Sequence, residues 1–499
     1  MNIDTKLGEV TFITTGKLDA NARDHHGKYP FFTCGEENLT INAAAFDTEA
    51  VLLAGNGNFS VKYYKGKFNA YQRTYVITPK LVDGKWLFYL VMHHVAKITA
   101  GARGSTIKYL RISDITDCAV KLVPLSHQKR IVAKIEELFS KLDNSIAALK
   151  TAREQLRVYR QAILKHAFEG KLTAKWREEN ADKLETSEQL LDRIQQERDA
   201  RYQQQLEDWK TAVKEWETRG KKQKRPAKPK KTEQITSLLS SEIQKLYELP
   251  EGWIFLRLGN FIDKIDAGKS FKCDERPPIA GEVGVVKVSA VTWGEYNESE
   301  SKTCLDAEKV NPAYFIKNGD FILSRANTIE LVGNCIITKR VTKPIMLSDK
   351  TLRINFSSIN QKYVLEYLRS HYGRTEIMDR STGNQESMRN IGQDRIKSIV
   401  IPICGRAEMD VIEISLNEKF ESISQLSKEI KIQLLKAENL RQSILKQAFS
   451  GQLVPQDPND EPASKLLDRI KAEKKLLVTG RATKKQRPIN RSRQANARS

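Results

Sequence analysis

One fragment of a nucleotide-binding loop stands in this chain of 499 residues. The tripeptide Gly268-Lys269-Ser270 matches the end of a Walker A loop, whose backbone N–H groups cradle phosphates. That loop also needs a glycine five positions before Gly268, where this chain has Asp263. We therefore expect no ATP binding by this chain.

Two further fragments lack a residue that their chemistry needs. Gly55-Asn56-Gly57-Asn58 begins like a dinucleotide loop, but Ser60 takes the final glycine position, so we expect a turn between strands. Asn311-Pro312-Ala313-Tyr314 resembles the Asn-Pro-Pro-Tyr loop of amino-methyltransferases, without its second proline. No glycine-rich loop for S-adenosylmethionine accompanies it. The sequence thus predicts no catalytic residues.

The histidines and cysteines predict neither a metal site nor disulfides. Adjacent residues such as His25-His26 and His93-His94 would point to opposite faces of a strand, which is poor metal geometry. The six cysteines include no C-x-x-C pair, which fits a protein of the reducing cytoplasm. The N-terminus has no apolar signal region, and the apolar run Trp86–Met92 is too short to cross a bilayer.

The second half of the chain repeats the first. RQAILKHAFEGKL, from Arg160, returns as RQSILKQAFSGQL, from Arg441, with nine of thirteen residues identical at an offset of 281. At the same offset Phe139 matches Phe420 and Ile131 matches Ile412. The string LLDRI, the basic string KKQKRP or KKQRP, and the dipeptide Leu-Gly (Leu7-Gly8 in the first copy) also occur twice. A period this long indicates two copies of a whole module and predicts pseudo-twofold symmetry, which suits duplex DNA.

The charge supports a polyanionic partner. The formal net charge is +21 and the sequence pI is near 9.5. Such an excess favours nucleic acid through counterion release and long-range attraction. A ribosome-associated protein, or a chain with basic tails only, remains the alternative.

The chain is long enough for several domains, and we expect an α+β protein. Expected strands are Ala50–Ala54, Tyr75–Thr78, Trp86–Met92 and Val120–Val123 in the first copy, and Gly284–Val288, Phe321–Leu323, Cys335–Thr338 and Ser398–Ile401 in the second. The expected segments are a globular domain over 1–125, a long helix over 126–170, a charged helical and basic linker over 171–247, a second globular domain over 248–403, a second long helix over 404–451, and a C-terminal helix with a basic tail over 452–499.

Both long helices carry apolar residues at alternating steps of four and three, which is typical of a coiled-coil seam. The expected seam residues are Ile131, Ile135, Leu138, Leu142, Leu149, Leu156 and Ile163 in the first helix, and Ile412, Leu416, Ile423, Leu426, Ile430, Leu440 and Ile444 in the second. Lys419 and Gln433 would be polar intrusions in the second seam, and Gly170 and Gly451 would end the helices. Two seams of equal length favour an antiparallel coiled coil that separates the globular domains in a pseudo-twofold arrangement. Packing of each helix on its own domain is the alternative.

The segment Arg219–Lys231 holds eight basic residues and no acid, and the chain from Thr479 onwards holds seven. Such runs cannot form a core. Contact with phosphates and a merely solvated linker both remain open.

Four segments carry a resemblance to a known family. They are VPLSHQKRIV from Val123, the doubled helix end from Arg160 and Arg441, LPEGWIFLRL from Leu249, and DFILSRANTIELVG from Asp320. In these the chain resembles the specificity subunit of type I restriction–modification enzymes over nearly its full length. The first domain lacks the LPEGW opening, and Met409 replaces the usual glutamine of the second junction.

The resemblance implies a non-catalytic subunit. Two target recognition domains would each read one half of a split double-stranded DNA site, and the paired helices would dock two modification subunits. Those methyltransferase subunits would hold S-adenosylmethionine and flip the adenine. Restriction subunits, with ATP and Mg²⁺ for translocation and cleavage, would complete the assembly. The resemblance implies no membrane partner.

Loops between strands are where base-reading side chains project. Candidate DNA-binding residues are Asn56, Asn58, Lys62, Tyr64, Arg73, Arg103, Ser105 and Thr106 in the first domain, and Lys269, Lys272, Arg325, Asn327, Thr328, Asn384, Gln385 and Arg389 in the second. Each could instead contact phosphate or shape a turn.

The helix length would act as a ruler for the gap between the half-sites. A change of a few residues near Ala147-Ala148 should alter the gap or abolish binding, and leave both half-site sequences unchanged. Two rival functions remain: a methyltransferase or nuclease that reads its own site, and a structural coiled-coil or RNA-binding protein.

Overall fold

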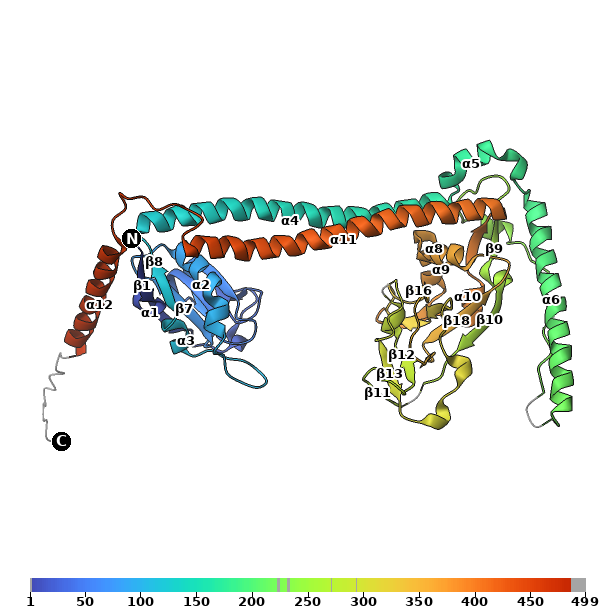
Figure 1. Cartoon of the computed structure of the whole chain (residues 1–499), viewed down its shortest axis with the longest axis horizontal. Coiled ribbons are helices and arrows are strands. Elements are labelled where there is room, and N and C mark those ends of the chain that lie inside the picture. Colours follow the sequence, from blue (N-terminus) through green and yellow to red (C-terminus); the bar gives the residue numbers. More distant parts are fainter. Residues whose placement is uncertain (1, 222–224, 231–233, 271, 293, 486–499) are drawn as a thin grey trace, which may run out of the picture. The chain divides into compact units, whose positions relative to one another are not determined.

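The computed structural model describes residues 2–221, 225–230, 234–270, 272–292 and 294–485. The chain divides into two compact units (Figure 1). Unit 1 comprises residues 1–151 and 429–499, and unit 2 comprises residues 152–428. Each unit therefore combines a globular domain with a part of both long helices, and the α+β class expected from the sequence is confirmed.

Unit 1 is built around a six-stranded sheet of order β2-β7-β5-β6-β3-β4, with β1 and β8 paired separately. Its strands are β1 (Ile3–Lys6), β2 (Thr11–Thr15), β3 (Tyr29–Phe32), β4 (Leu39–Ile41), β5 (Phe46–Ala54), β6 (Val61–Ala70), β7 (Thr74–Pro79) and β8 (Ala119–Leu122). Its shorter helices are α1 (Leu7–Val10), α2 (Gly84–Thr99), α3 (Ile112–Thr116) and α12 (Ala463–Lys485).

The second half of β5, Ala50–Ala54, is buried on both faces because every residue of this run is apolar. Val51 and Leu53 belong to the core that includes α2, while Ala50 and Leu52 belong to a second core with Phe32 and Phe68. A strand that is covered on both faces reads as a continuous apolar run, which is how AVLLA reads in the sequence.

The strand expected over Trp86–Met92 is wrong, because this run lies inside α2. The side chain of Asp83 accepts a hydrogen bond from the Trp86 N–H and starts the helix. Trp86, Leu87 and Leu90 are buried, a helical spacing that a short apolar run does not distinguish from a buried strand. The other expected strands each fall on a strand of the structure.

Unit 2 contains two four-stranded sheets, β10-β18-β14-β16 and β11-β13-β12-β17, a three-stranded sheet β15-β20-β19, and the pair β21-β9. Its strands are β9 (Ile254–Arg257), β10 (Ile262–Ala267), β11 (Cys273–Asp274), β12 (Gly284–Val286), β13 (Ser301–Cys304), β14 (Phe321–Ser324), β15 (Ala326–Asn327), β16 (Cys335–Ile337), β17 (Ile345–Met346), β18 (Thr351–Phe356), β19 (Thr382–Gln385), β20 (Met388–Asn390) and β21 (Val400–Ile403). Its shorter helices are α5 (Ala174–Glu179), α6 (Ser187–Thr218), α7 (Ser240–Ile243), α8 (Gln361–Arg369), α9 (His371–Arg380) and α10 (Gln393–Lys397).

The repeated Leu-Gly dipeptide has the same place in both units. The Leu7 N–H donates to the Cys118 carbonyl at 2.9 Å, and the Leu258 N–H donates to the Ile399 carbonyl at 2.7 Å. The following glycine is needed for close approach: a Cβ on Gly8 would lie 2.8 Å from the Thr116 Cβ, and one on Gly259 would lie 2.9 Å from the Lys397 Cβ. The repeated dipeptide therefore makes the same backbone hydrogen bond and the same close packing contact in both units.

The long helices are α4 (Leu125–Phe168) and α11 (Arg406–Ser450), and they run antiparallel within each unit. In unit 1 the Arg441 guanidinium lies 4.9 Å from the centre of the Phe139 ring, and it also pairs with Asp143. In unit 2 the Arg160 guanidinium lies 3.9 Å from the Phe420 ring. These two cation–π contacts join residues that match at the repeat offset. The expected antiparallel pairing is therefore confirmed within each unit.

Two of the expected seam residues are wrong. The side chains of Leu426 and Leu440 are 54% and 49% exposed. The buried positions of α11 include Ile423, Ile430, Ala437 and Ile444. A step of four from 423 and from 437 reaches Ser427 and Arg441, one residue beyond each leucine, and one residue turns a helix by about 100°.

The other expected seam residues are buried or half-buried. Half-buried Phe420 and Leu434 stand one residue after the expected polar intrusions, Lys419 and Gln433. Gly170 and Gly451 adopt positive φ angles of 70° and 83° just beyond the two helix ends, as expected. In the part of the chain that the structure describes, no helix combines the length and the hydrophobicity needed to cross a membrane.

Candidate nucleic-acid interface

A polar edge of unit 1, here called crown 1, gathers candidate residues from three loops. It comprises residues 55–58, Arg73 and residues 103–109. The Gly55 N–H donates to the Arg73 carbonyl at 2.8 Å, and the Gly55 carbonyl accepts from the Leu110 N–H at 2.9 Å. Tyr109 forms β-bridges with both Asn56 and Arg103. Backbone bonds thus hold the three loops together and leave their side chains at the surface.

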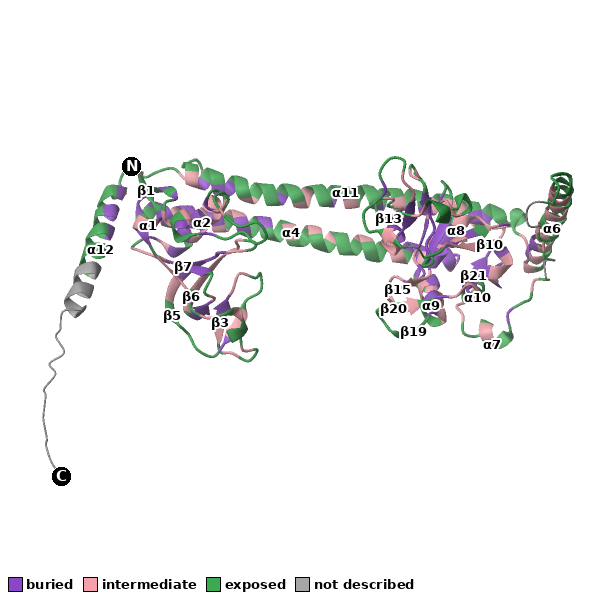
Figure 2. Cartoon of the chain, turned by 90° about the horizontal axis from the view of Figure 1, so that it is seen from below, coloured by how far each residue is buried: buried purple, intermediate pink, exposed green. Residues whose placement is uncertain are grey.

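Unit 2 has an equivalent edge, crown 2, which comprises residues 325–328, Lys350 and the hairpin 382–390. The Arg325 N–H donates to the Lys350 carbonyl at 3.0 Å, and the Arg325 carbonyl accepts from the Ile391 N–H at 2.9 Å. Strand β15 pairs with β20, which pairs with β19, so the hairpin is tied in the same way (Figure 2). The two crowns therefore share one backbone hydrogen-bond pattern.

The crowns differ in how freely they present the candidate side chains. Asn58, Arg73, Ser105 and Thr106 of crown 1 are exposed, and Asn56 is half-buried. Asn384 and Gln385 of crown 2 are exposed, whereas Arg325, Asn327 and Thr328 are half-buried. The Asn327 side chain accepts a hydrogen bond from the Thr328 N–H, so it also shapes its own turn.

Two arginines nominated from the sequence are held by other groups of the chain. Both carboxylate oxygens of Asp114 accept from the Arg103 guanidinium, at 3.0 and 3.3 Å. The Arg389 guanidinium donates to the Ser381 hydroxyl and carbonyl and to the Gly383 carbonyl. Arg103 therefore braces the loop 103–109 of crown 1, and Arg389 braces the hairpin 382–390 of crown 2.

Lys62 and Tyr64 of β6 also have structural partners. The Lys62 ammonium donates to the carbonyls of Gly35 and Glu36 and to the Asn38 side chain, at 2.7 to 3.0 Å. Its partial burial lowers the pKa of Lys62 below the usual value for lysine. The Tyr64 ring packs against Phe32 and Phe68. Lys62 therefore fixes the loop before β4, and Tyr64 covers the second core.

The loop after β10 carries two candidate lysines of unit 2. Lys269 and Lys272 are exposed, and β11 follows them, where a phosphate loop would need a helix. The sequence reasoning missed Lys350, which is exposed and occupies the crown position of Arg73. A Ser-Asp-Lys turn before a strand was the only available signal for it.

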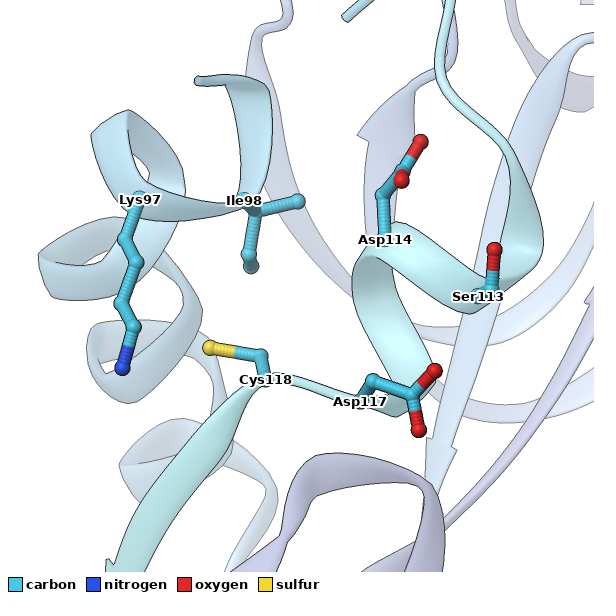
Figure 3. A pocket seen from close by; sticks show the side chains of 6 residues that line it. All are labelled: Lys97, Ile98, Ser113, Asp114, Asp117 and Cys118. Carbon is cyan, nitrogen blue, oxygen red and sulfur yellow. The ribbon is translucent and has the colours of Figure 1, made fainter. Parts of the chain in front are cut away.

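A small pocket in unit 1 does not suit a phosphate. Figure 3 shows Lys97 and Ile98 of α2 facing Ser113, Asp114, Asp117 and Cys118. Two carboxylates on its wall would repel an anion, and they already pair with Arg103 and Lys6. Burial raises the pKa of the Cys118 thiol, which keeps it protonated and unreactive.

Comparison with known proteins gives a consistent result. A family model described as the type I restriction modification DNA specificity domain matches residues 4–156. The EcoDI type I restriction enzyme specificity subunit of Escherichia coli is 30% identical over 491 residues, which cover 96% of this chain and 97% of that protein. The EcoKI specificity subunit of Escherichia coli K12 is 22% identical over 79% of this chain and 72% of its own length.

A solved structure shares the fold. It comes from work on complex assembly and conformational transition of a type I restriction–modification system. The two chains superpose with a TM-score of 0.55 at 15% identity, over 90% of this chain and 98% of the other.

Two α+β units with matching polar crowns define a duplicated recognition protein. The chain belongs to the family of type I restriction–modification specificity subunits. The resemblance found in the sequence is thereby confirmed. Membership implies DNA sequence recognition and assembly with other subunits.

Proposed function

We propose that this chain is the DNA sequence-recognition subunit of a cytoplasmic type I restriction–modification complex. Unit 1 reads one half of a bipartite duplex site through crown 1, and unit 2 reads the other half through crown 2. The long helices set the gap between the half-sites. The chain itself carries no catalytic residue.

The observation that carries this proposal is the shared backbone pattern of the two crowns. Gly55 and Arg325 make the same pair of backbone hydrogen bonds in units that share little side-chain identity there. Loops held by backbone bonds keep their shape when their side chains change, so the same frame can present different base-reading groups. Exposed cations, such as Lys350 of crown 2 and Lys269 of the loop after β10, supply phosphate contacts that position the frame.

The long helices also supply a surface for partner subunits. Apolar side chains are exposed to solvent along both helices, and exposed apolar surface of this kind marks a site of contact with another protein. They are Val158 and Tyr159 of α4, and Ile414, Leu426, Ile432, Leu435 and Leu440 of α11. We assign them to two modification subunits, which would hold S-adenosylmethionine, while restriction subunits with ATP and Mg²⁺ join the same assembly. That a chain of similar fold comes from work on complex assembly of a type I restriction–modification system supports assembly with other subunits in general.

The deciding experiment selects bound duplexes from a random pool, with the chain in complex with its modification subunits. We expect two short conserved blocks separated by a gap of fixed length and free sequence. Recovery of no preferred duplex would favour a structural or RNA-binding protein. Methylation of the pool by the purified chain alone, with labelled S-adenosylmethionine, would indicate an enzyme and would refute the proposal.

A further inference from the structure

A helical arm of unit 2 lies outside the crowns and the paired helices. It consists of α6 (Ser187–Thr218), the residues that follow it to Lys221, and residues 225–230, the returning segment, which lies back along it. Leu190 and Ile194 bury the first turns of α6 in the core of unit 2, and Arg201 pairs with Asp263. Beyond Ile194 no residue of α6 is buried (Figure 2). The arm is anchored at its base and exposed along the rest of its length.

The returning segment is attached to the outer half of α6. The Trp209 indole N–H donates to the Pro226 carbonyl at 3.0 Å, and the Lys228 ammonium lies 5.9 Å from the centre of the Trp209 ring. Nearer the base, the Ile235 N–H donates to the Gln195 side chain at 3.1 Å. These contacts give the outer half a defined shape, unlike a solvated linker.

Charge is separated along the arm. Residues 187–208 contain six acidic and three basic side chains, whereas the described residues 209–221 and 225–230, here called the tip, contain two acidic and seven basic ones. The base is therefore net −3 and the tip net +5. Cations at the tip with no acidic partner among the described contacts are Lys214, Lys221, Arg225, Lys228 and Lys230. A helix that needed charge only for solubility would mix both signs along its length.

The composition of the tip favours DNA over a protein partner. Protein interfaces centre on exposed apolar and aromatic side chains. Within the described residues of the tip, no large apolar side chain is among the exposed ones, and the Trp209 indole is held by the returning segment. Five of the seven described basic residues at the tip are lysines, which bind phosphate as point charges without reading bases.

We propose that the tip of this arm binds the phosphate backbone of duplex DNA outside the recognised half-site. The inference rests on the proposed function, since it adds a contact to the same bound duplex. A helix of 32 residues spans about 48 Å, or about 14 base pairs at about 3.4 Å each. The arm thus strengthens binding without changing the sequence that is read.

The test changes Lys214, Lys221, Arg225, Lys228 and Lys230 together to glutamine in the full chain bound to its modification subunits. Affinity is measured against salt on two duplexes that carry the selected site, with flanks of about 25 or about 3 base pairs, lengths set by the reach of α6. On long flanks we expect the slope of log K against log salt to fall by about 0.9 per lost contact, up to about 4.5. On short flanks variant and unchanged protein should bind equally.

A matched control removes the same charge from lysines that already have acidic partners, and it should leave both duplexes unaffected. These are Lys175, Lys302, Lys309, Lys362 and Lys397. An unchanged slope on long flanks, or an equal loss on both duplexes, would overturn the proposal. So would loss of a partner subunit with DNA binding intact, which would make the tip a site for an acidic protein. The proposed function is judged separately, by whether the random pool gives a split sequence.

Discussion

Glu408, in the first turn of α11, joins three parts of unit 2 through one buried carboxylate. Its side chain is 3% exposed and accepts from the Arg177 guanidinium at 2.5 Å and from the Thr173 hydroxyl at 2.6 Å. Its second oxygen accepts from the Trp253 indole N–H at 2.9 Å. Trp253 opens the globular domain just before β9, and Arg177 lies in α5. The carboxylate therefore fastens the globular domain of unit 2 to the long helix.

Replacing Glu408 with leucine should destabilise unit 2 strongly. Removal of one member of a buried ion pair costs about 3–5 kcal/mol, because the other charge is left buried without compensation. Arg177, only 16% exposed, would be that charge, and the Trp253 N–H would lose its acceptor as well. Glu408→Gln keeps an acceptor for the indole and loses only the charge, so we expect about 1.5–3 kcal/mol.

Urea unfolding, with hydrogen exchange followed by peptide, would measure the effect in each unit separately. Peptides of β9 and α5 should lose protection, and peptides of α2 in unit 1 should not. Glu418→Gln, at an exposed position of the same helix, is the control and should change stability by less than about 0.5 kcal/mol. Adding Arg177→Met to Glu408→Leu should restore much of the loss. A cost below about 1 kcal/mol for Glu408→Leu alone would refute the reasoning.

Four further predictions concern unit 1, the crowns and the helices. Pairing with Arg130 holds the pKa of Asp460 at about 2, so the stability it adds is complete above the unfolded value near 4 and is lost as pH falls through 2. Asp460→Asn should remove this part of the acid sensitivity in a pH series of melting curves; an unaltered acid limb would contradict the assignment. Gln385→Ala should relax one position of the selected sequence by about 1–3 kcal/mol, whereas Lys269→Ala should weaken all duplexes equally, as competition binding would show; the reverse pattern would exchange their roles. Seven residues inserted into each long helix, after Ala147 in α4 and at the facing position of α11, should lengthen the selected gap or abolish binding; altered half-site bases would dismiss the ruler. Leu435→Asp should abolish co-purification with modification subunits, while Ile279→Asp, equally exposed outside the helices, should not.

The elements with strong periodicity were predictable, and short apolar runs were not. The 4-3 spacing fixed α4 and α11 and their pairing, because only a seam satisfies that spacing for 40 residues. Leu426 and Leu440 misled because each stands next to a seam position held by a polar residue. The run Trp86–Met92 misled because its helix is revealed by the cap at Asp83, three residues earlier, rather than by its own pattern.

The sequence predicted which loops form the candidate site. It did not predict which of their side chains have hydrogen-bond donors free to contact DNA. Nothing local in the sequence shows that Lys62 is occupied by carbonyls of 35–38, or that Arg389 is occupied by residues 381–383. These contacts depend on how the strands pair, because strand pairing decides whether a cationic side chain hydrogen-bonds to other residues of the same chain. Lys350 was missed for the same reason. Only the backbone hydrogen bond from Arg325 reveals that Lys350 occupies the position in crown 2 that Arg73 occupies in crown 1.

The shared frame of the crowns has a consequence for what is read. At equivalent positions unit 1 has Gly55 and Asn56 where unit 2 has Arg325 and Ala326. Major-groove readout depends on the donors and acceptors offered, and arginine selects guanine where asparagine selects adenine. Under the proposed function, equal frames with unequal side chains should therefore select unequal half-sites. We expect the split site to lack twofold symmetry in its bases, so that the bound complex has a direction on the DNA although its scaffold is repeated.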